Sequence, residues 1–197
     1  MVPALTSPGR SPRIGGIGDE IAMSSTEPRK DSPTVTPEWT SLARRIDGVV
    51  IKHVPPVEDE RGEICEMYRP SWAIHPDPLV YVYAVTIRPR KIKGWVQHKA
   101  QDDRVFVLRG AIRFGLFDDR PSSPTFKLLN VFTLSERNRG LVIIPRGVYH
   151  ALQNVGETEA MFVNMPTTPY DHANPDKYRL PIKNDLIPFA FENLPGW

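Results

Sequence analysis

Cysteine, net charge and long apolar runs are all scarce in this 197-residue chain. The single cysteine, Cys65, excludes an intramolecular disulfide bond and is typical of a reducing compartment. A formal net charge of +2 gives no electrostatic basis for binding nucleic acid. No apolar run approaches the roughly 20 residues of a membrane span, and Arg10 and Arg13 interrupt any signal-peptide core. We therefore expect a cytoplasmic protein without nucleic-acid or membrane partners.

The N-terminal segment differs in composition from the rest of the chain. It is rich in Pro, Ser, Thr and Gly and has almost no periodic apolar residues. Such a segment buries too little surface to offset its chain entropy, so residues 1–42 are predicted to be a disordered tail. Residues 43–197 are long enough to form one domain with its own core. The proline-rich residues from about 168 onwards are expected to form an extended, weakly helical wrap across this domain.

Short apolar or alternating segments recur from Ile46 onwards, at intervals of roughly ten residues. Turn-forming residues separate them, and Arg109-Gly110 joins two of the segments. Many short strands with regular turn signals are typical of a closed antiparallel architecture, so the fold is predicted to be all-β. The expected strands cover residues 48–53, 64–68, 79–88, 104–109, 111–117, 127–134, 141–144, 150–154 and 160–165.

The run from Gly140 to Asn154 is the most informative stretch of the chain, because it combines an apolar strand, a tight turn and a histidine. Pro145 ends the first strand, and Gly147 supplies the backbone freedom for a sharp reversal. His150 then starts a second strand, with its imidazole directed toward the core. The spacing of these five residues resembles the second conserved motif of the cupin superfamily. The resemblance implies a cupin jelly-roll barrel, also called a double-stranded β-helix.

Further segments narrow this resemblance to one family. They are D-E-R-G-E-I-C-E (59–66), Q-D-D-R-V-F-V-L-R-G (101–110), D-D-R-P-S-S-P-T-F (118–126), the run 134–150, T-T-P-Y (167–170) and K-N-D (183–185). In this order they are similar to the dTDP-4-dehydrorhamnose 3,5-epimerase family over about residues 46–190. The resemblance implies a homodimeric isomerase of carbohydrate biosynthesis, which epimerises C3 and C5 of a dTDP-4-keto-6-deoxy sugar or a related carbohydrate. It also implies that no cofactor is needed, because the ketone of the substrate acidifies the neighbouring C–H bonds.

The resemblance assigns five residues to substrate binding. Arg61 and Glu66 match the family segment that contacts the nucleotide from the partner subunit. Lys93 stands where the family carries an arginine, and we expect it to meet the diphosphate. The family's pyrophosphate-binding lysine falls at Asp103, a reversal of charge, and the nearby Gln101 and Arg104 are also assigned to substrate binding.

The catalytic positions depart from the family pattern. The histidine base of the family falls at Val96, which cannot take a proton. His98 lies two residues further on, on the same face of a strand, so it is the predicted base. The proton-donating tyrosine of the family falls near residues 163–165, where this chain has none. Tyr170 is therefore the predicted acid, and His150 the predicted contact to the enolate or phosphate.

A second interpretation is a metal-dependent cupin that uses His98, Asp103 and His150 as ligands. Two histidines and one carboxylate suit Fe(II), Zn(II) or Mn(II), with Gln101 as a fourth oxygen donor. Asp103 also has a simpler alternative, an ion pair with Arg104 or Arg113.

A third interpretation is a cupin that binds a small ligand without catalysis, which the substitution of the family base by Val96 favours. The sequence leaves the epimerase, the metal enzyme and the binding protein as alternatives.

Overall fold

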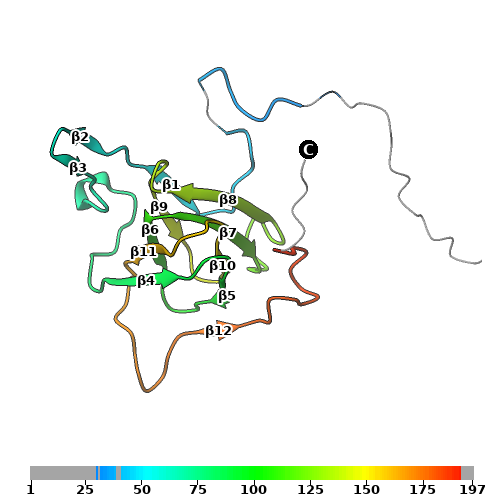
Figure 1. The fold of residues 1–197 in the computed structure, drawn as a ribbon. Helices are drawn as coiled ribbons and strands as arrows, with labels where there is room; N and C mark the ends of the chain where they lie inside the picture. The colour runs from blue at the N-terminus through cyan, green and yellow to red at the C-terminus, as the bar shows by residue number, and fades with distance from the viewer. Residues whose placement is uncertain (1–29, 31, 39–40, 192–197) are drawn as a thin grey trace, which may run out of the picture. The chain divides into compact units, whose positions relative to one another are not determined.

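The computed structural model describes residues 30, 32–38 and 41–191 (Figure 1). Two compact units divide at Ala43 and Arg44. Most of the predicted disordered tail, namely residues 1–29, 31, 39 and 40, lies outside the described residues, so that expectation stays a prediction. The described part of the first unit contains a local turn, in which Val35 pairs with Ser41.

The second unit is built from two five-stranded antiparallel sheets (Figure 1). The first sheet has the spatial order β1 (Val50–His53), β9 (Gly140–Ile144), β6 (Asp103–Arg109), β11 (Ala160–Asn164) and β4 (Tyr83–Ile87). The second has the order β12 (Tyr178–Arg179), β5 (Ile92–Gln97), β10 (Val148–Asn154), β7 (Ala111–Asp118) and β8 (Leu129–Ser135). This arrangement confirms the predicted all-β jelly roll.

The core lies between the two sheets and decides which way the site residues point. Val105 and Val107 of β6 pack in the main apolar cluster with Phe114 of β7, whereas Phe106 joins a separate cluster on the other face of β6. Because side chains alternate along a strand, Asp103 shares the inner face with Val105 and lines the same cavity.

Three expectations about individual segments are wrong. The strand expected at 64–68 does not form; the chain makes a hairpin of β2 (Val57–Asp59) and β3 (Gly62–Ile64) around the turn Glu60-Arg61, and β3 already ends at Ile64. Strand β5 was missed, since glycine and polar residues interrupt its apolar pattern. The wrap, described from residue 168 to 191, is extended as expected but not weakly helical; its prolines leave β12 (Tyr178–Arg179) as the only regular element in that range.

Within the described ranges, the single helix is the three-residue 3-10 turn Pro70–Trp72, which falls far short of a membrane span.

The β2–β3 hairpin forms an arm that projects from the barrel (Figure 1). Val57 and Ile64 face each other across the hairpin, and their exposed fractions are 76% and 77%. Two large apolar side chains at a cross-strand pair are thus left uncovered by the rest of the described chain.

Candidate functional site

The turn before His150 is fixed directly against the segment that carries His98. The Gly147 N–H donates to the His98 carbonyl over 2.7 Å, and the Gln97 side-chain amide donates to the Gly147 carbonyl over 3.0 Å. Gly147 has φ +79°, and a Cβ there would meet Arg120 Cγ at 2.7 Å. Glycine therefore meets both a conformational and a steric requirement at this turn.

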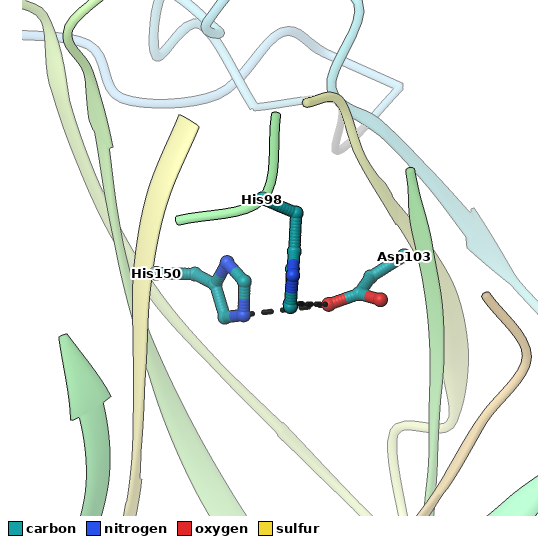
Figure 2. Close-up of side chains that lie close together, drawn as sticks. All are labelled: His98, Asp103 and His150. Carbon is teal, nitrogen blue, oxygen red and sulfur yellow. Dashed lines mark ion pairs between the residues drawn. The ribbon is translucent and has the colours of Figure 1, made fainter. Parts of the chain in front are cut away.

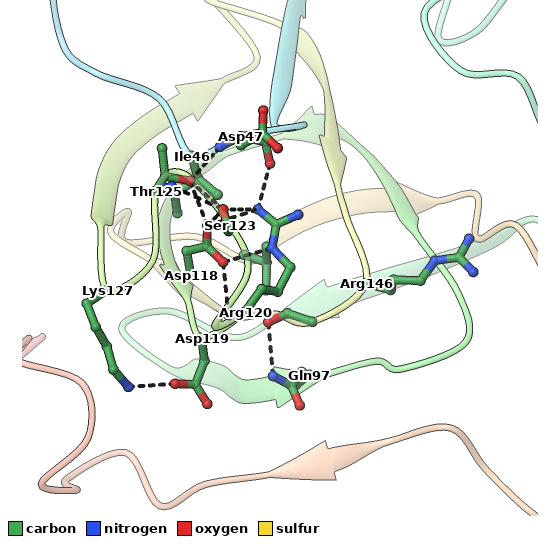
Figure 3. A network of polar contacts seen from close by, with 12 residues as sticks. Ile46, Asp47, Gln97, Asp118, Asp119, Arg120, Ser123, Thr125, Lys127 and Arg146 are labelled. Carbon is green, nitrogen blue, oxygen red and sulfur yellow. Dashed lines mark hydrogen bonds and ion pairs between the residues drawn. The ribbon is translucent and has the colours of Figure 1, made fainter.

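The fully buried Asp118 carboxylate binds Arg120, and the Arg120 side chain lies against Gly147 of this turn (Figure 3). It accepts hydrogen bonds from Arg120 Nε over 2.8 Å and from the Ser123 and Thr125 hydroxyls over 2.6 Å. Burial alone would raise the pKa of Asp118, but these donors hold it well below its ordinary value. The Arg120 guanidinium also donates to the Asp47 carbonyl, so the segment 118–126 has a structural role.

Three side chains from different elements converge inside the barrel (Figure 2). His98 follows β5, Asp103 begins β6, and His150 lies in β10. Oδ2 of Asp103 lies 3.4 Å from Nε2 of His98 and 3.4 Å from Nε2 of His150. The Asp103 side chain is only 2% exposed, so its charge is stabilised by these neighbours rather than by water.

The second oxygen of Asp103 accepts two amide hydrogen bonds. Gln101 Nε2 and Asn164 Nδ2 each lie 3.1 Å from Oδ1. A carboxylate only accepts, so both amides must present nitrogen here, and Gln101 Oε1 instead accepts from the Thr168 hydroxyl over 3.2 Å. In this arrangement Gln101 directs its nitrogen, and not the oxygen expected as a fourth ligand, toward Asp103.

The hydrogen-bond partners of the histidines fix their chemistry. Nδ1 of His98 contacts the backbone carbonyl of Asp176, which only accepts, so Nδ1 carries a proton; in the neutral imidazole Nε2 has the lone pair, and in the imidazolium the Nε2–H faces Asp103. Burial alone would lower the pKa of His98, but the hydrogen bond and charge of Asp103 raise it above its ordinary value. Burial lowers the pKa of His150 to about 4, so this imidazole is neutral at pH 7.

Burial alone would also raise the pKa of Asp103, but His98 and His150 lower it to about 2. The site at neutral pH therefore holds a carboxylate between a neutral His150 and a His98 whose protonated form that carboxylate stabilises.

These side chains line a cavity of about 400 Å³ that also carries cations. Lys93, Lys177 and Arg179 belong to its lining. Burial and the charges of Arg179 and Lys93, which line the same cavity, lower the pKa of Lys177. A cavity of about 460 Å³ adjoins it and shares Tyr83, His98 and Lys177 with its lining. We call the two cavities together the cleft. Its cations can bind an anionic group of a ligand, and its histidines can contact a polar ring.

Arg104 lies on the opposite face of β6 from Asp103. It is fully buried, and its guanidinium donates to the backbone carbonyls of Met165, Asp77 and Pro78 over 2.6, 2.9 and 2.9 Å. Through these bonds Arg104 fixes the backbone of the two loops that contain the three carbonyls. The expected ion pair of Asp103 with Arg104 or Arg113 is wrong, because the two arginines bond carbonyls and Gln153 respectively.

The remaining predicted residues are spread more widely. Lys93 lines the cavity, whereas Arg61 lies in the arm, paired with Asp59, and Glu66 is paired with Arg69. Neither Arg61 nor Glu66 belongs to the lining of the cleft of their own chain.

Tyr170 is 45% exposed and lines the outer cavity, where its ring packs edge-on against His172. It therefore lies at the entrance to the cleft.

The three convergent residues also have the geometry of metal ligands. The ligand atoms of His98, Asp103 and His150 lie within 4.8 Å of one another. A backbone carbonyl behind Nδ1, as at His98, is the outer contact that metal-binding histidines make.

A second group of this kind consists of His75, Asp77 and Asp102, which are all partly buried. The Asp102 carboxylate lies 2.9 Å from Arg146 Nε and 3.0 Å from His75 Nε2, and the His75 side chain is only 7% exposed.

Four cavity residues were missed in the sequence. Tyr83 and Asn164 are cross-strand partners of β4 and β11, and only the strand register brings them together. Lys177 and Arg179 lie in the proline-rich wrap, where their spacing around Tyr178 was the available signal.

A jelly roll that encloses a carboxylate, two histidines and a set of cations defines a cupin with a site for an anionic small molecule. The sequence model of the dTDP-4-dehydrorhamnose 3,5-epimerase family matches residues 43–184. The chain therefore belongs to this family.

Two relatives and one solved structure illustrate the similarity. The probable low-salt glycan biosynthesis epimerase Agl13 of Haloferax volcanii is 32% identical over 138 residues, which is 69% of this chain and 88% of the relative. The spore coat polysaccharide biosynthesis protein SpsL of Bacillus subtilis is 31% identical over 144 residues, covering 73% and 95%. The crystal structure of a dTDP sugar isomerase from Desulfovibrio desulfuricans has a TM-score of 0.70 at 25% identity, covering 76% of this chain and 94% of that one.

These findings confirm the predicted family, the cupin fold and the isomerase class. They do not favour the metal-dependent or the non-catalytic alternative.

Proposed function

We propose that the chain epimerises a dTDP-linked 4-keto-6-deoxy sugar, or a related nucleotide sugar, by removing protons next to the ketone. One observation carries the proposal: a buried, charged Asp103 lies between two imidazoles in a cavity that also holds three cations. The reaction needs a base, a proton donor, a group that stabilises the enolate and cations for the diphosphate. The names of the family and of the isomerase from Desulfovibrio support the substrate class.

His98 is the base in this proposal. Its Nδ1–H is held by the Asp176 carbonyl, so Nε2 can accept a proton from carbon. The Asp103 carboxylate, 3.4 Å from Nε2, stabilises the imidazolium that forms. His98 thus replaces the base that the family places at the position of Val96, and both side chains line the cavity.

His150 stabilises the enolate in this proposal, and the cations of the cavity bind the diphosphate. A neutral imidazole can donate one hydrogen bond to the enolate oxygen without adding charge to the cavity. Lys93, Lys177 and Arg179 bind the diphosphate. The ketone of the substrate acidifies the C–H bonds, so the proposed reaction uses no cofactor.

The protein would act as a homodimer. Val57 and Ile64 on the arm need a cover, and the partner barrel can provide it. Docking of the arm would also bring Arg61 and Glu66 to the nucleotide in the neighbouring cleft. A cytoplasmic location, for which the single Cys65 is typical, completes the proposal.

The test is incubation of the purified protein with dTDP-4-keto-6-deoxyglucose in D₂O, with deuterium uptake at C3 and C5 followed by NMR. Uptake that disappears in His98→Ala is the expected result. Absence of uptake at high enzyme concentration would contradict the proposal for this substrate.

The alternatives give different results in two companion measurements. Stoichiometric Fe, Zn or Mn in the purified protein, lost in Asp103→Asn, would support a metal site at His98, Asp103 and His150. A thermal shift with dTDP in the absence of any exchange would support a binding protein, since a ligand at 100 times its Kd stabilises by about 2.7 kcal/mol.

A further inference from the structure

We propose that Tyr83 is the catalytic acid, which delivers a proton to the carbon on the face opposite His98. The inference rests on the proposed function and names a residue that the sequence did not assign. Two observations carry it: Tyr83 lines the cleft, and the Asn164 amide donates a hydrogen bond to the Tyr83 hydroxyl oxygen.

Tyr83 is the first residue of β4 and pairs with Asn164 of β11. It lines both cavities of the cleft, together with His98 and Lys177. Its position at the junction is where a sugar ring must lie if the diphosphate meets the cations and a ring carbon meets His98. Tyr83 is thus the phenol that shares the inner cavity with the base.

The amide of Asn164 connects Tyr83 to the buried carboxylate. Asn164 Nδ2 lies 3.1 Å from Asp103 Oδ1 and 2.9 Å from the Tyr83 hydroxyl. The carboxylate only accepts, so the amide nitrogen must face it, and the same nitrogen donates its second hydrogen to the Tyr83 oxygen. The O–H of Tyr83 is therefore free to donate elsewhere, into the cleft.

The protonation state of Tyr83 agrees with this role. Burial and the nearby charge of Asp103 raise the pKa of its phenol. Tyr83 therefore carries its proton at neutral pH, as an acid must. Once the proton is given away, the Asn164 N–H remains in place to stabilise the phenolate.

The step balances without a further reactant. His98 Nε2 takes the proton from the carbon next to the ketone, and the C–H electron pair moves to the carbonyl oxygen to form the enolate. The carbonyl then re-forms as the carbon takes the Tyr83 proton on its other face. Solvent removes the proton from His98 and returns one to Tyr83.

Tyr170 is the competing acid that the sequence predicts. Its ring lies at the outer cavity, is 45% exposed and packs against His172. Tyr83 by contrast shares the inner cavity with Asp103 and His150. The structure thus favours the inner tyrosine.

The experiment separates exchange from inversion. Wild type, Tyr83→Phe, Tyr170→Phe and Tyr81→Phe are incubated with dTDP-4-keto-6-deoxyglucose in D₂O, and both deuterium uptake and epimer formation are measured by NMR. Without its acid, the enzyme can still return a solvent-derived proton from the base to the original face. Tyr83→Phe should therefore keep deuterium uptake while epimer formation falls by about 100-fold or more.

Tyr81→Phe is the matched control, because Tyr81 neighbours Tyr83 with ring centroids 5.2 Å apart but does not line the cleft. Normal epimer formation in Tyr83→Phe, or its loss in Tyr170→Phe instead, would overturn the inference. So would the loss of both signals in a Tyr83→Phe protein that unfolds at the wild-type temperature. Absence of both signals in the wild type would contradict the proposed function instead.

Discussion

The backbone N–H of Gly147 donates to the carbonyl of His98 over 2.7 Å. This bond joins the turn that leads into β10 to the end of β5, and it places His98 and His150 with ring centroids 5.5 Å apart. Two residues far apart in the sequence thus share one carboxylate because a glycine turn fits closely against the neighbouring strand end.

Gly147→Ala should destabilise the protein and the site together. The residue has φ +79°, and the added Cβ would lie 2.7 Å from Arg120 Cγ. We expect a loss of about 1–3 kcal/mol in the free energy of unfolding, measured by urea denaturation. Gly156→Ala is the matched control, because its Cβ would meet nothing nearer than 3.4 Å. Equal stability of the two variants would contradict this account of the turn.

Asp103→Asn should lower the rate and move the pH profile. The base must be unprotonated, so kcat/KM of the wild type should rise with pH through the raised pKa of His98. Removal of the carboxylate charge leaves burial to lower that pKa, so the rising limb should move to lower pH, with a smaller plateau. Measurement of kcat/KM from pH 5 to 9 tests this. An unshifted limb would show that Asp103 does not control His98.

His150 should make the fold sensitive to acid. Its pKa is lowered from 6.5 to about 4, so the unfolded chain binds a proton at higher pH than the folded one. The contribution of His150 to stability is therefore present above pH 6.5 and lost as the pH falls toward 4, by up to about 3 kcal/mol.

His150→Gln removes this contribution, so its stability should fall less than that of wild type between pH 6.5 and 4.5. Urea denaturation at the two pH values provides the test. The raised pKa of His98 acts in the opposite direction in both proteins, with stability lost as the pH rises through it, so only the difference between them is diagnostic. Identical acid sensitivity would contradict the neutral, buried state of His150.

Removal of cavity cations should weaken nucleotide binding. Lys177→Ala and Arg179→Ala each remove a donor to the diphosphate, and each should raise the Kd for dTDP about tenfold or more in calorimetric titration. Arg137→Ala is a charge-matched control outside the cleft. If all three variants bind dTDP alike, the diphosphate lies elsewhere.

The arm should hold the dimer together. Val57→Asp places a charge on a side chain that is 76% exposed in the single chain and that the partner would cover. Light scattering after size-exclusion chromatography should show a dimer for wild type and a monomer for the variant. Glu58→Asp, at the next position of β2, serves as the control. A monomeric wild type would contradict the assembly.

Much of the fold was predictable, because the relevant signals are local. The apolar runs of β9 and β10 and the Pro145-Gly147 turn predicted both strands, and five spaced residues identified the cupin motif. Strand β5 was missed for the same reason, since Lys93 and Gly94 break its local pattern. The proline-rich wrap has no periodic signal, and the weak helical character expected for it is absent from residues 168–191, where the structure describes it.

The sequence by itself determined the family, the all-β class and the pairing of His98 with His150 as candidates for one cavity. Only the tertiary structure decided that Asp103 faces these histidines while Arg104 faces loop carbonyls on the other side. It also decided that Tyr83 meets Asn164. The physical reason is that strand register and loop closure join residues distant in sequence, and no local pattern encodes which partner a side chain will face.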